Sequence, residues 1–103
     1  MIKSITPQEL HSKINNKDSF VLIDVRTSAE REQFNIGGLH YPLEEISHYI
    51  DQIYFSKQVV FYCEKGIRSL IAIQRLENKQ TENNLYNLQG GMNAWKKHFN
   101  ESE

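Results

Sequence analysis

The sequence contains only one cysteine, Cys63, among its 103 residues, so the chain cannot form an internal disulfide. The sequence also has no large excess of one charge, because 12 basic residues are balanced by 13 acidic ones. A chain with this balance lacks the positive surface potential that favours binding to nucleic acid. No apolar run approaches the length of a membrane span, and the first residues have no signal-peptide core. We therefore expect a reduced cytoplasmic protein that binds neither nucleic acid nor membrane.

Metal-ligand spacing is missing as well. The four histidines, His11, His40, His48 and His98, are scattered along the chain, and with one cysteine they predict no zinc site. We expect no metal and no cofactor. A cysteine–histidine dyad like that of the thiol proteases would need His40 or His48 near Cys63, and the sequence gives no sign of one.

The composition is that of an ordinary globular protein, with 39% apolar and 24% charged residues. A chain of this length can build one core but not two. We therefore expect a single domain over residues 1–100, followed by a loose tail at 101–103.

Apolar runs alternate with helical patterns along the chain. Two capping boxes, Thr6 with Glu9 and Thr27 with Glu30, predict helices that continue to about residues 14 and 34. Further helical spacing follows. The expected strands are 2–5, 20–25, 39–41, 59–62 and 84–88, and the later helices cover 43–53, 67–76 and 92–99. Apolar strands between helices predict an α/β fold with a mostly parallel central sheet and helices on both faces.

Cys63 is expected at the carboxyl end of the 59–62 strand, just ahead of a helix. Ligands bind at such strand ends in parallel sheets. Free N–H groups and the helix dipole make the position electropositive, which favours the nucleophilic thiolate. Lys65 and Arg68 add positive charge, and Gly66 lets the backbone curl. A lone cysteine can also be a small buried hydrophobe, but such a residue needs no Gly, Lys and Arg after it.

The segment Cys63-Glu64-Lys65-Gly66-Ile67-Arg68-Ser69 resembles the active-site loop of the rhodanese family of sulfurtransferases, Cys-x-x-Gly-x-Arg-Ser. Residues 22–30 are similar to the family's Asp-Val-Arg segment, and residues 88–95 to its Gly-Gly-x-x-x-Trp signature. The three segments follow the family's order and span nearly the whole chain. The resemblance implies a three-layer rhodanese-like fold.

The resemblance also implies a reaction. Cys63 would take sulfane sulfur from a donor, such as thiosulfate or the persulfide of a cysteine desulfurase, and pass it as a persulfide to a thiophilic acceptor. The substrate-binding residues would be Glu64, Lys65, Gly66, Ile67, Arg68 and Ser69. Their N–H groups would bind the anion as an oxyanion hole does, and Arg68 would bind an anionic donor. Glu64 should make the site less attractive to small dianions.

Two residues after the 20–23 run are expected to support this loop. Asp24 lies inside an apolar strand, where a charge is costly unless paired. We expect Asp24 to pair with the loop, through its N–H groups or through Arg68, and Arg26 to pair with Glu30.

One segment departs from the common family pattern. Many members have Gly-His-Ile-x-Gly-Ala before the third strand, whereas residues 35–43 here are shorter and lack that histidine. This variant resembles the rhodanese domain at the C-terminus of adenylyltransferases that activate sulfur-carrier proteins for molybdopterin and thiamine synthesis. It implies a sulfur-carrier protein as acceptor, and a chain that is either free-standing or an excised domain.

Two other function classes remain open. Dual-specificity phosphatases of the Cdc25 type share this fold and use a loop cysteine, but their motif is Cys-x5-Arg, whereas four residues separate Cys63 from Arg68 here. The smaller loop suits a sulfur atom better than a phosphoryl group. The third class, a non-catalytic interaction module, would not need Cys63.

Overall fold

The structure is a computed structural model that describes residues 2–80 and 83–99. The tail expected at 101–103 lies outside the described residues. The elements in chain order are β1 (Lys3–Ile5), α1 (Pro7–Asn15), β2 (Val21–Asp24), α2 (Ser28–Gln33), β3 (Leu39–His40), the 3-10 helix η1 (Leu43–Gln52), β4 (Val59–Tyr62), α3 (Arg68–Glu77), β5 (Leu85–Leu88) and α4 (Gly91–Phe99).

The described strands form one five-stranded sheet in the order β1-β5-β4-β2-β3, and every pair is parallel. The register places Asp24 of β2 beside Tyr62 of β4. Both strands therefore end at the same edge of the sheet, and Cys63 follows directly from β4. This confirms the α/β fold predicted from the sequence, and the carboxyl edge of the sheet is where ligands bind in such folds.

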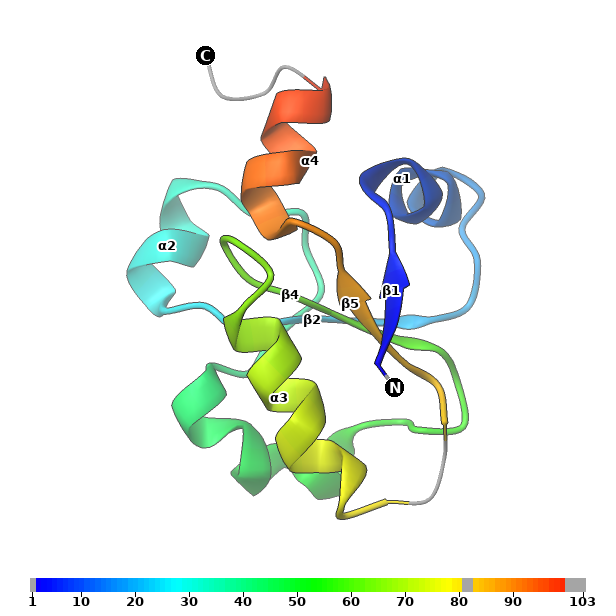
Figure 1. The fold of residues 1–103 in the computed structure, drawn as a ribbon, viewed down its shortest axis with the longest axis vertical. Helices are drawn as coiled ribbons and strands as arrows, with labels where there is room; N and C mark the ends of the chain where they lie inside the picture. The colour runs from blue at the N-terminus through cyan, green and yellow to red at the C-terminus, as the bar shows by residue number, and fades with distance from the viewer. Residues whose placement is uncertain (1, 81–82, 100–103) are drawn as a thin grey trace.

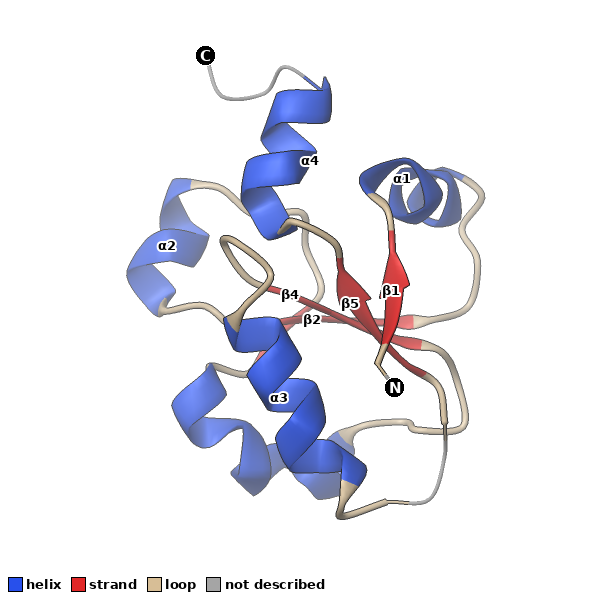
Figure 2. Cartoon of the chain, in the orientation of Figure 1, coloured by secondary structure: helices blue, strands red, loops and turns tan. Residues whose placement is uncertain are grey.

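Helices cover both faces of the sheet (Figures 1 and 2). On one face, α3 and η1 pack through Ile46, Ile73 and Leu76 against alternate residues of β2 and β4. On the other face, α1 and α4 bury Leu10 and Trp95 against the remaining strand residues. Successive strand side chains point to opposite faces, so both faces of β4 are apolar and all four of its residues are buried.

The two predicted capping boxes are present. Thr6 caps α1 and Thr27 caps α2, and in each box the carboxylate of the glutamate three residues later accepts a hydrogen bond from the backbone N–H of the cap residue. Each box satisfies two N–H groups that the first turn of a helix leaves free. The second box matters for the site, because its glutamate, Glu30, also contacts the loop after β4.

One detail of the predicted helix at 67–76 is wrong. The prediction begins the helix at Ile67, but α3 begins at Arg68 and the Ile67 side chain is 60% exposed. The buried face of α3 consists of Ser69, Ala72, Ile73 and Leu76. The helix starts one residue later because the chain is still curling around Cys63 at Ile67, which places that side chain outside.

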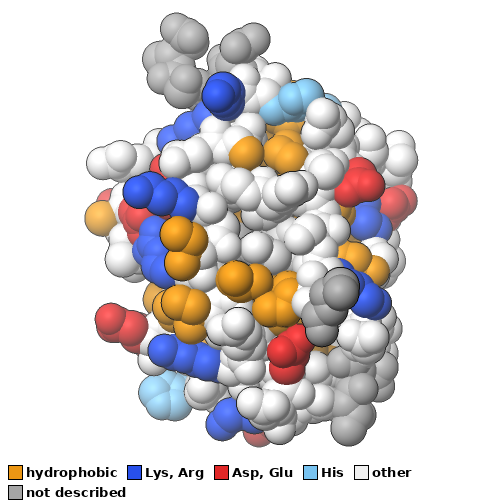
Figure 3. All heavy atoms as spheres, in the orientation of Figure 1, with side chains coloured by type: hydrophobic (Ala, Val, Ile, Leu, Met, Phe, Trp, Pro, Cys, Tyr) orange, Lys and Arg blue, Asp and Glu red, His pale blue; other side chains and the backbone are white. Residues whose placement is uncertain are grey.

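The surface carries both signs of charge. In Figure 3 basic and acidic side chains are interspersed around apolar ones on the face that carries α3. Within residues 2–80 and 83–99, no helix has the length and apolarity needed to cross a membrane. The same residues contain no cluster of three or more His, Cys, Asp or Glu side chains arranged to hold a metal ion.

Candidate active site

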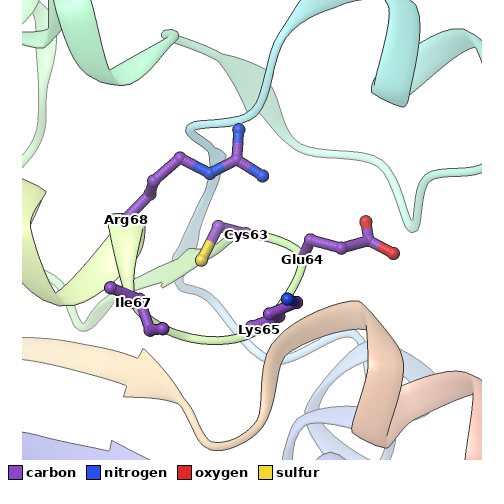
Figure 4. A pocket seen from close by; sticks show the side chains of 5 residues that line it. All are labelled: Cys63, Glu64, Lys65, Ile67 and Arg68. Atoms are coloured by element: carbon purple, nitrogen blue, oxygen red, sulfur yellow. The ribbon is translucent and has the colours of Figure 1, made fainter.

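Cys63 lies at the base of a pocket of about 340 Å³ lined by Cys63, Glu64, Lys65, Ile67 and Arg68 (Figure 4). Its side chain is buried, and the loop curves around the sulfur in the close-up view. The Glu64 carboxylate points away from the sulfur in the same view. The pocket therefore brings together most of the residues expected at the site.

Two backbone amides point at the sulfur. The Gly66 N–H donates to Sγ at 3.1 Å and the Ser69 N–H donates at 3.3 Å. Ser69 is in the first turn of α3, whose N-terminal residue has no side-chain cap, so its amide is one of the donors that a helix leaves free. Of the N–H groups expected to face the sulfur, those of Gly66 and Ser69 therefore do so.

This arrangement of N–H groups depends on Gly66. Its φ of +89° lies in the left-handed region, which a side chain disfavours. This conformation turns its own N–H back toward Cys63. The predicted role of Gly66 in curling the loop is therefore present in the structure.

The loop rests on the start of α4. The Met92 N–H donates to the Cys63 carbonyl at 2.8 Å, and the Asn93 N–H donates to the Glu64 carbonyl at 3.0 Å. A Cβ on Gly91 would lie 2.5 Å from the Cys63 carbonyl oxygen, so only glycine allows this approach. The glycine pair before α4 therefore allows the Cys63 loop to lie directly against the start of that helix.

Arg68 lines the pocket, but its guanidinium is bound by Glu30 of α2. Nη1 and Nη2 donate to the two carboxylate oxygens at 2.8 Å each. This pairing lowers the pKa of Glu30 to about 2 and raises that of Arg68. The predicted pairing of Glu30 with Arg26 is therefore wrong.

Asp24 and Arg26 form a buried ion pair. Arg26 donates from Nε and Nη2 to the two Asp24 oxygens at 3.0 Å each, and both side chains are almost fully buried. Burial opposes the charged form of Arg26, but the hydrogen bonds and charge of Asp24 outweigh it and raise its pKa. Arg31 also contacts Asp24, at 3.2 Å.

We expected Asp24 to pair with the loop N–H groups or with Arg68, and this prediction is wrong. Asp24 and Arg26 are two positions apart in an extended segment, so their side chains project to the same side and meet directly. Arg26 then reaches the loop itself, with Nη1 donating to Glu64 at 3.3 Å. Asp24 supports the loop through Arg26 rather than by contact.

Sequence reasoning missed Asn87 of β5. Its Oδ1 accepts a hydrogen bond from the Ser69 hydroxyl at 2.5 Å, and its Nδ2 donates to the Gly66 carbonyl at 3.1 Å. The available signal was a polar residue inside an apolar strand, similar to the signal that singled out Asp24. His40, one of the two histidines considered as a partner for Cys63, instead contacts the Arg26 carbonyl oxygen through Nε2 at 2.7 Å.

Comparison with known proteins extends this picture. Residues 6–98 match the family model described as Rhodanese-like domain. The chain is 32% identical to a sulfurtransferase of Allochromatium vinosum over 95% of this chain and 92% of that protein. It is 31% identical to the thiosulfate sulfurtransferase GlpE of Coxiella burnetii over the whole chain and 95% of that protein.

A longer protein and a solved structure are also similar. The adenylyltransferase and sulfurtransferase MOCS3 of Drosophila willistoni is 28% identical over 85% of this chain, which covers 21% of that protein. A crystal structure of a rhodanese-like domain protein from Staphylococcus aureus superposes with a TM-score of 0.81 at 27% identity, over 91% of each chain.

Proposed function

The chain belongs to the rhodanese-like domain family, and on that premise we propose that it transfers sulfane sulfur through a persulfide on Cys63. The observation that carries this proposal is the pair of amide donors from Gly66 and Ser69 on a buried sulfur at the base of a pocket. The sulfurtransferase class has the support of relatives that bear that name.

The proposed loading step uses thiosulfate or a protein persulfide as donor. With thiosulfate, the Cys63 thiolate attacks the sulfane sulfur, and a bond forms between that atom and Sγ. The sulfur–sulfur bond of thiosulfate breaks, and sulfite leaves with its electron pair. The negative charge is now on the outer sulfur, one bond farther from the Cys63 side chain and into the pocket. Lys65 and Arg68 are among the residues that line this pocket.

The unloading step reverses the electron flow. A thiophilic acceptor such as cyanide attacks the outer sulfur and leaves as thiocyanate, while the electron pair of the broken bond returns to Sγ. The amides of Gly66 and Ser69 receive that charge without moving, since both already point at the sulfur. Groups set in place before charge develops stabilise it most effectively.

The proposed physiological acceptor is a sulfur-carrier protein, as in molybdopterin or thiamine synthesis. This part rests on the variant segment at residues 35–43 and on the similarity to MOCS3, a protein named as both adenylyltransferase and sulfurtransferase. Its test uses a sulfur-carrier protein with an adenylated C-terminus, the loaded protein and dithiothreitol as reductant. Appearance of a carrier thiocarboxylate in the intact mass is expected, and an unmodified carrier would contradict it.

Intact mass tests the core of the proposal. After incubation with thiosulfate, or with a cysteine desulfurase and cysteine, the protein should gain the mass of one sulfur atom, and cyanide should remove it. Cys63→Ser should keep the fold and gain nothing. A serine variant that still turns over thiosulfate and cyanide would overturn the proposal.

The phosphatase alternative has a direct test in the same preparation. The four-residue spacing between Cys63 and Arg68 leaves less room for a phosphoryl group than Cys-x5-Arg does, and misplacement by about 1 Å can cost on the order of 100-fold in rate. We expect negligible hydrolysis of an aryl phosphate. Cys63-dependent phosphate turnover without sulfur transfer would replace the sulfurtransferase assignment.

A further inference from the structure

A buried amide on the central sheet contacts the loop around Cys63 at two points, Gly66 and Ser69. Asn87 lies on β5, beside Phe61 of β4, and is only 8% exposed. Its Nδ2 donates to the carbonyl of Gly66. This contact fixes the orientation of the amide, because a flipped amide would place Oδ1 against the carbonyl oxygen. Oδ1 therefore faces Ser69.

The hydroxyl of Ser69 is shared by two neighbours but has only one proton. Ser69 Oγ lies 2.5 Å from Oδ1 of Asn87 and 3.3 Å from Sγ of Cys63. An amide oxygen can only accept, so the hydroxyl proton must go to Asn87. Ser69 then presents a lone pair to the sulfur, which suits a thiol that donates its hydrogen and opposes a thiolate.

We propose that Asn87 is a positioning residue for Cys63: by holding the hydroxyl proton of Ser69, it withholds one hydrogen bond from the thiolate. The anion is left with the two backbone amides as its donors. The inference deepens the proposed function, on which its catalytic meaning rests.

The withheld hydrogen bond affects the empty and loaded forms differently. In the empty form the negative charge is on Sγ, next to the lone pair of Ser69. In the persulfide the charge moves to the outer sulfur, and Sγ becomes a neutral, weak acceptor. Asn87 therefore destabilises the empty thiolate relative to the persulfide and favours retention of the sulfur atom.

The charged groups around Cys63 do not depend on Asn87. Glu64, Lys65 and Arg68 line the pocket. Glu30 reaches it from α2 by binding Arg68.

Behind Glu64, Arg26 and Asp24 form the buried pair at the end of β2. None of these charged side chains has a hydrogen bond to Asn87 or to the hydroxyl of Ser69 among the described contacts. A substitution of Asn87 therefore tests the hydroxyl proton and not the charges.

The test is the rate of alkylation of Cys63 by iodoacetamide as a function of pH. Asn87→Leu keeps the approximate size of the side chain and removes both its acceptor and its donor to the Gly66 carbonyl. Without the acceptor, the Ser69 hydroxyl becomes free to donate to the thiolate. A hydrogen bond to a charged group corresponds to a downward shift of the alkylation midpoint of about one pH unit. An unchanged or raised midpoint would overturn the proposal.

Ser69→Ala supplies a second test, in which the direction of the shift in the alkylation midpoint is the result. If Ser69 presents a lone pair to the sulfur, its removal lowers the midpoint. If the hydroxyl donated to the thiolate, its removal would raise the midpoint, and a raised or unchanged value overturns the proposal. In the double variant, Asn87→Leu should add no further shift to Ser69→Ala, and an additive shift would show that Asn87 acts by another route.

This measurement needs no sulfur donor. Failure of the proposed sulfur transfer and failure of the Asn87 proposal are therefore distinguishable. Circular dichroism checks that each variant folds, and if Asn87→Leu does not fold, the sign of the Ser69→Ala shift decides the question.

Discussion

Glu30 and Arg68 are 38 positions apart in the chain and form a two-pronged ion pair at 2.8 Å that ties helix α2 to the start of α3. The same carboxylate closes the capping box of α2 by accepting hydrogen bonds from Thr27. One side chain therefore fixes a helix N-terminus and the end of the Cys63 loop together. Arg68 therefore lines the pocket with its guanidinium fixed by Glu30 rather than free in solvent.

Glu30→Gln should lower the free energy of unfolding by about 1 kcal/mol at pH 7, the upper value for a pair that is partly exposed to solvent. The pKa of Glu30 is about 2 in the folded protein and 4.5 as its ordinary value. Between these values the unfolded chain binds more protons, so the stabilisation is present above pH 4.5 and is lost as pH falls toward 2. Urea titrations between pH 6 and 2.5 should show the difference from the native protein shrinking.

Glu32→Gln is the matched control for that series, because it removes the same charge from an exposed position of α2. It should leave the unfolding midpoint within experimental error at every pH. If both variants behave alike, the Glu30 effect is one of net charge and not of the ion pair.

The buried pair at the end of β2 should contribute far more than a surface pair. Arg26→Met removes the two hydrogen bonds that the Arg26 guanidinium donates to Asp24, and breaking a buried pair costs about 3–5 kcal/mol. Arg31→Met removes another contact from the same carboxylate, but Arg31 is 24% exposed, so its loss should cost about 1 kcal/mol or less. Equal losses in urea unfolding would contradict the buried role of Arg26.

Glu64 should weaken binding of small dianions, as the sequence analysis expected. One negative charge about 8 Å from a dianion in a water-like medium is worth on the order of 1 kcal/mol. Glu64→Gln should therefore lower KM for thiosulfate about fivefold, while kcat changes little. The effect should decrease with added salt. A KM that does not respond would show that the carboxylate is neutralised by Arg26.

Gly91 should be indispensable for the approach of α4 to the Cys63 loop. A Cβ there would lie 2.5 Å from the Cys63 carbonyl oxygen and 2.7 Å from that of Glu64. Gly91→Ala should lower the rate of sulfur transfer and the stability together, because the loop must shift.

Gly37→Ala separates backbone strain from collision in this experiment. Gly37 also has a positive φ, +90°, but a Cβ there would meet no atom within 4 Å. It should cost about 1–2 kcal/mol of stability through strain alone and leave sulfur transfer unchanged. Similar losses of activity in both variants would refute the role of close packing at Gly91.

The sequence by itself determined the order of strands and helices and the place of Cys63. Short local patterns are enough to predict both capping boxes, the buried strand β4 and the loop after it. Such features depend on neighbours within a few residues, and for that reason periodicity and helix caps reveal them.

Only the tertiary structure decided which charges pair and which groups surround the sulfur. Glu30 is only four positions from Arg26 in the sequence, but the fold places its carboxylate against Arg68 at the start of α3. Asn87 and Gly91 reach the loop from β5 and α4, more than 20 residues after Cys63. Contacts of this kind depend on how the strands align and the helices pack. That packing decides which donor lies next to the Glu30 carboxylate and which acceptor lies next to the Ser69 hydroxyl.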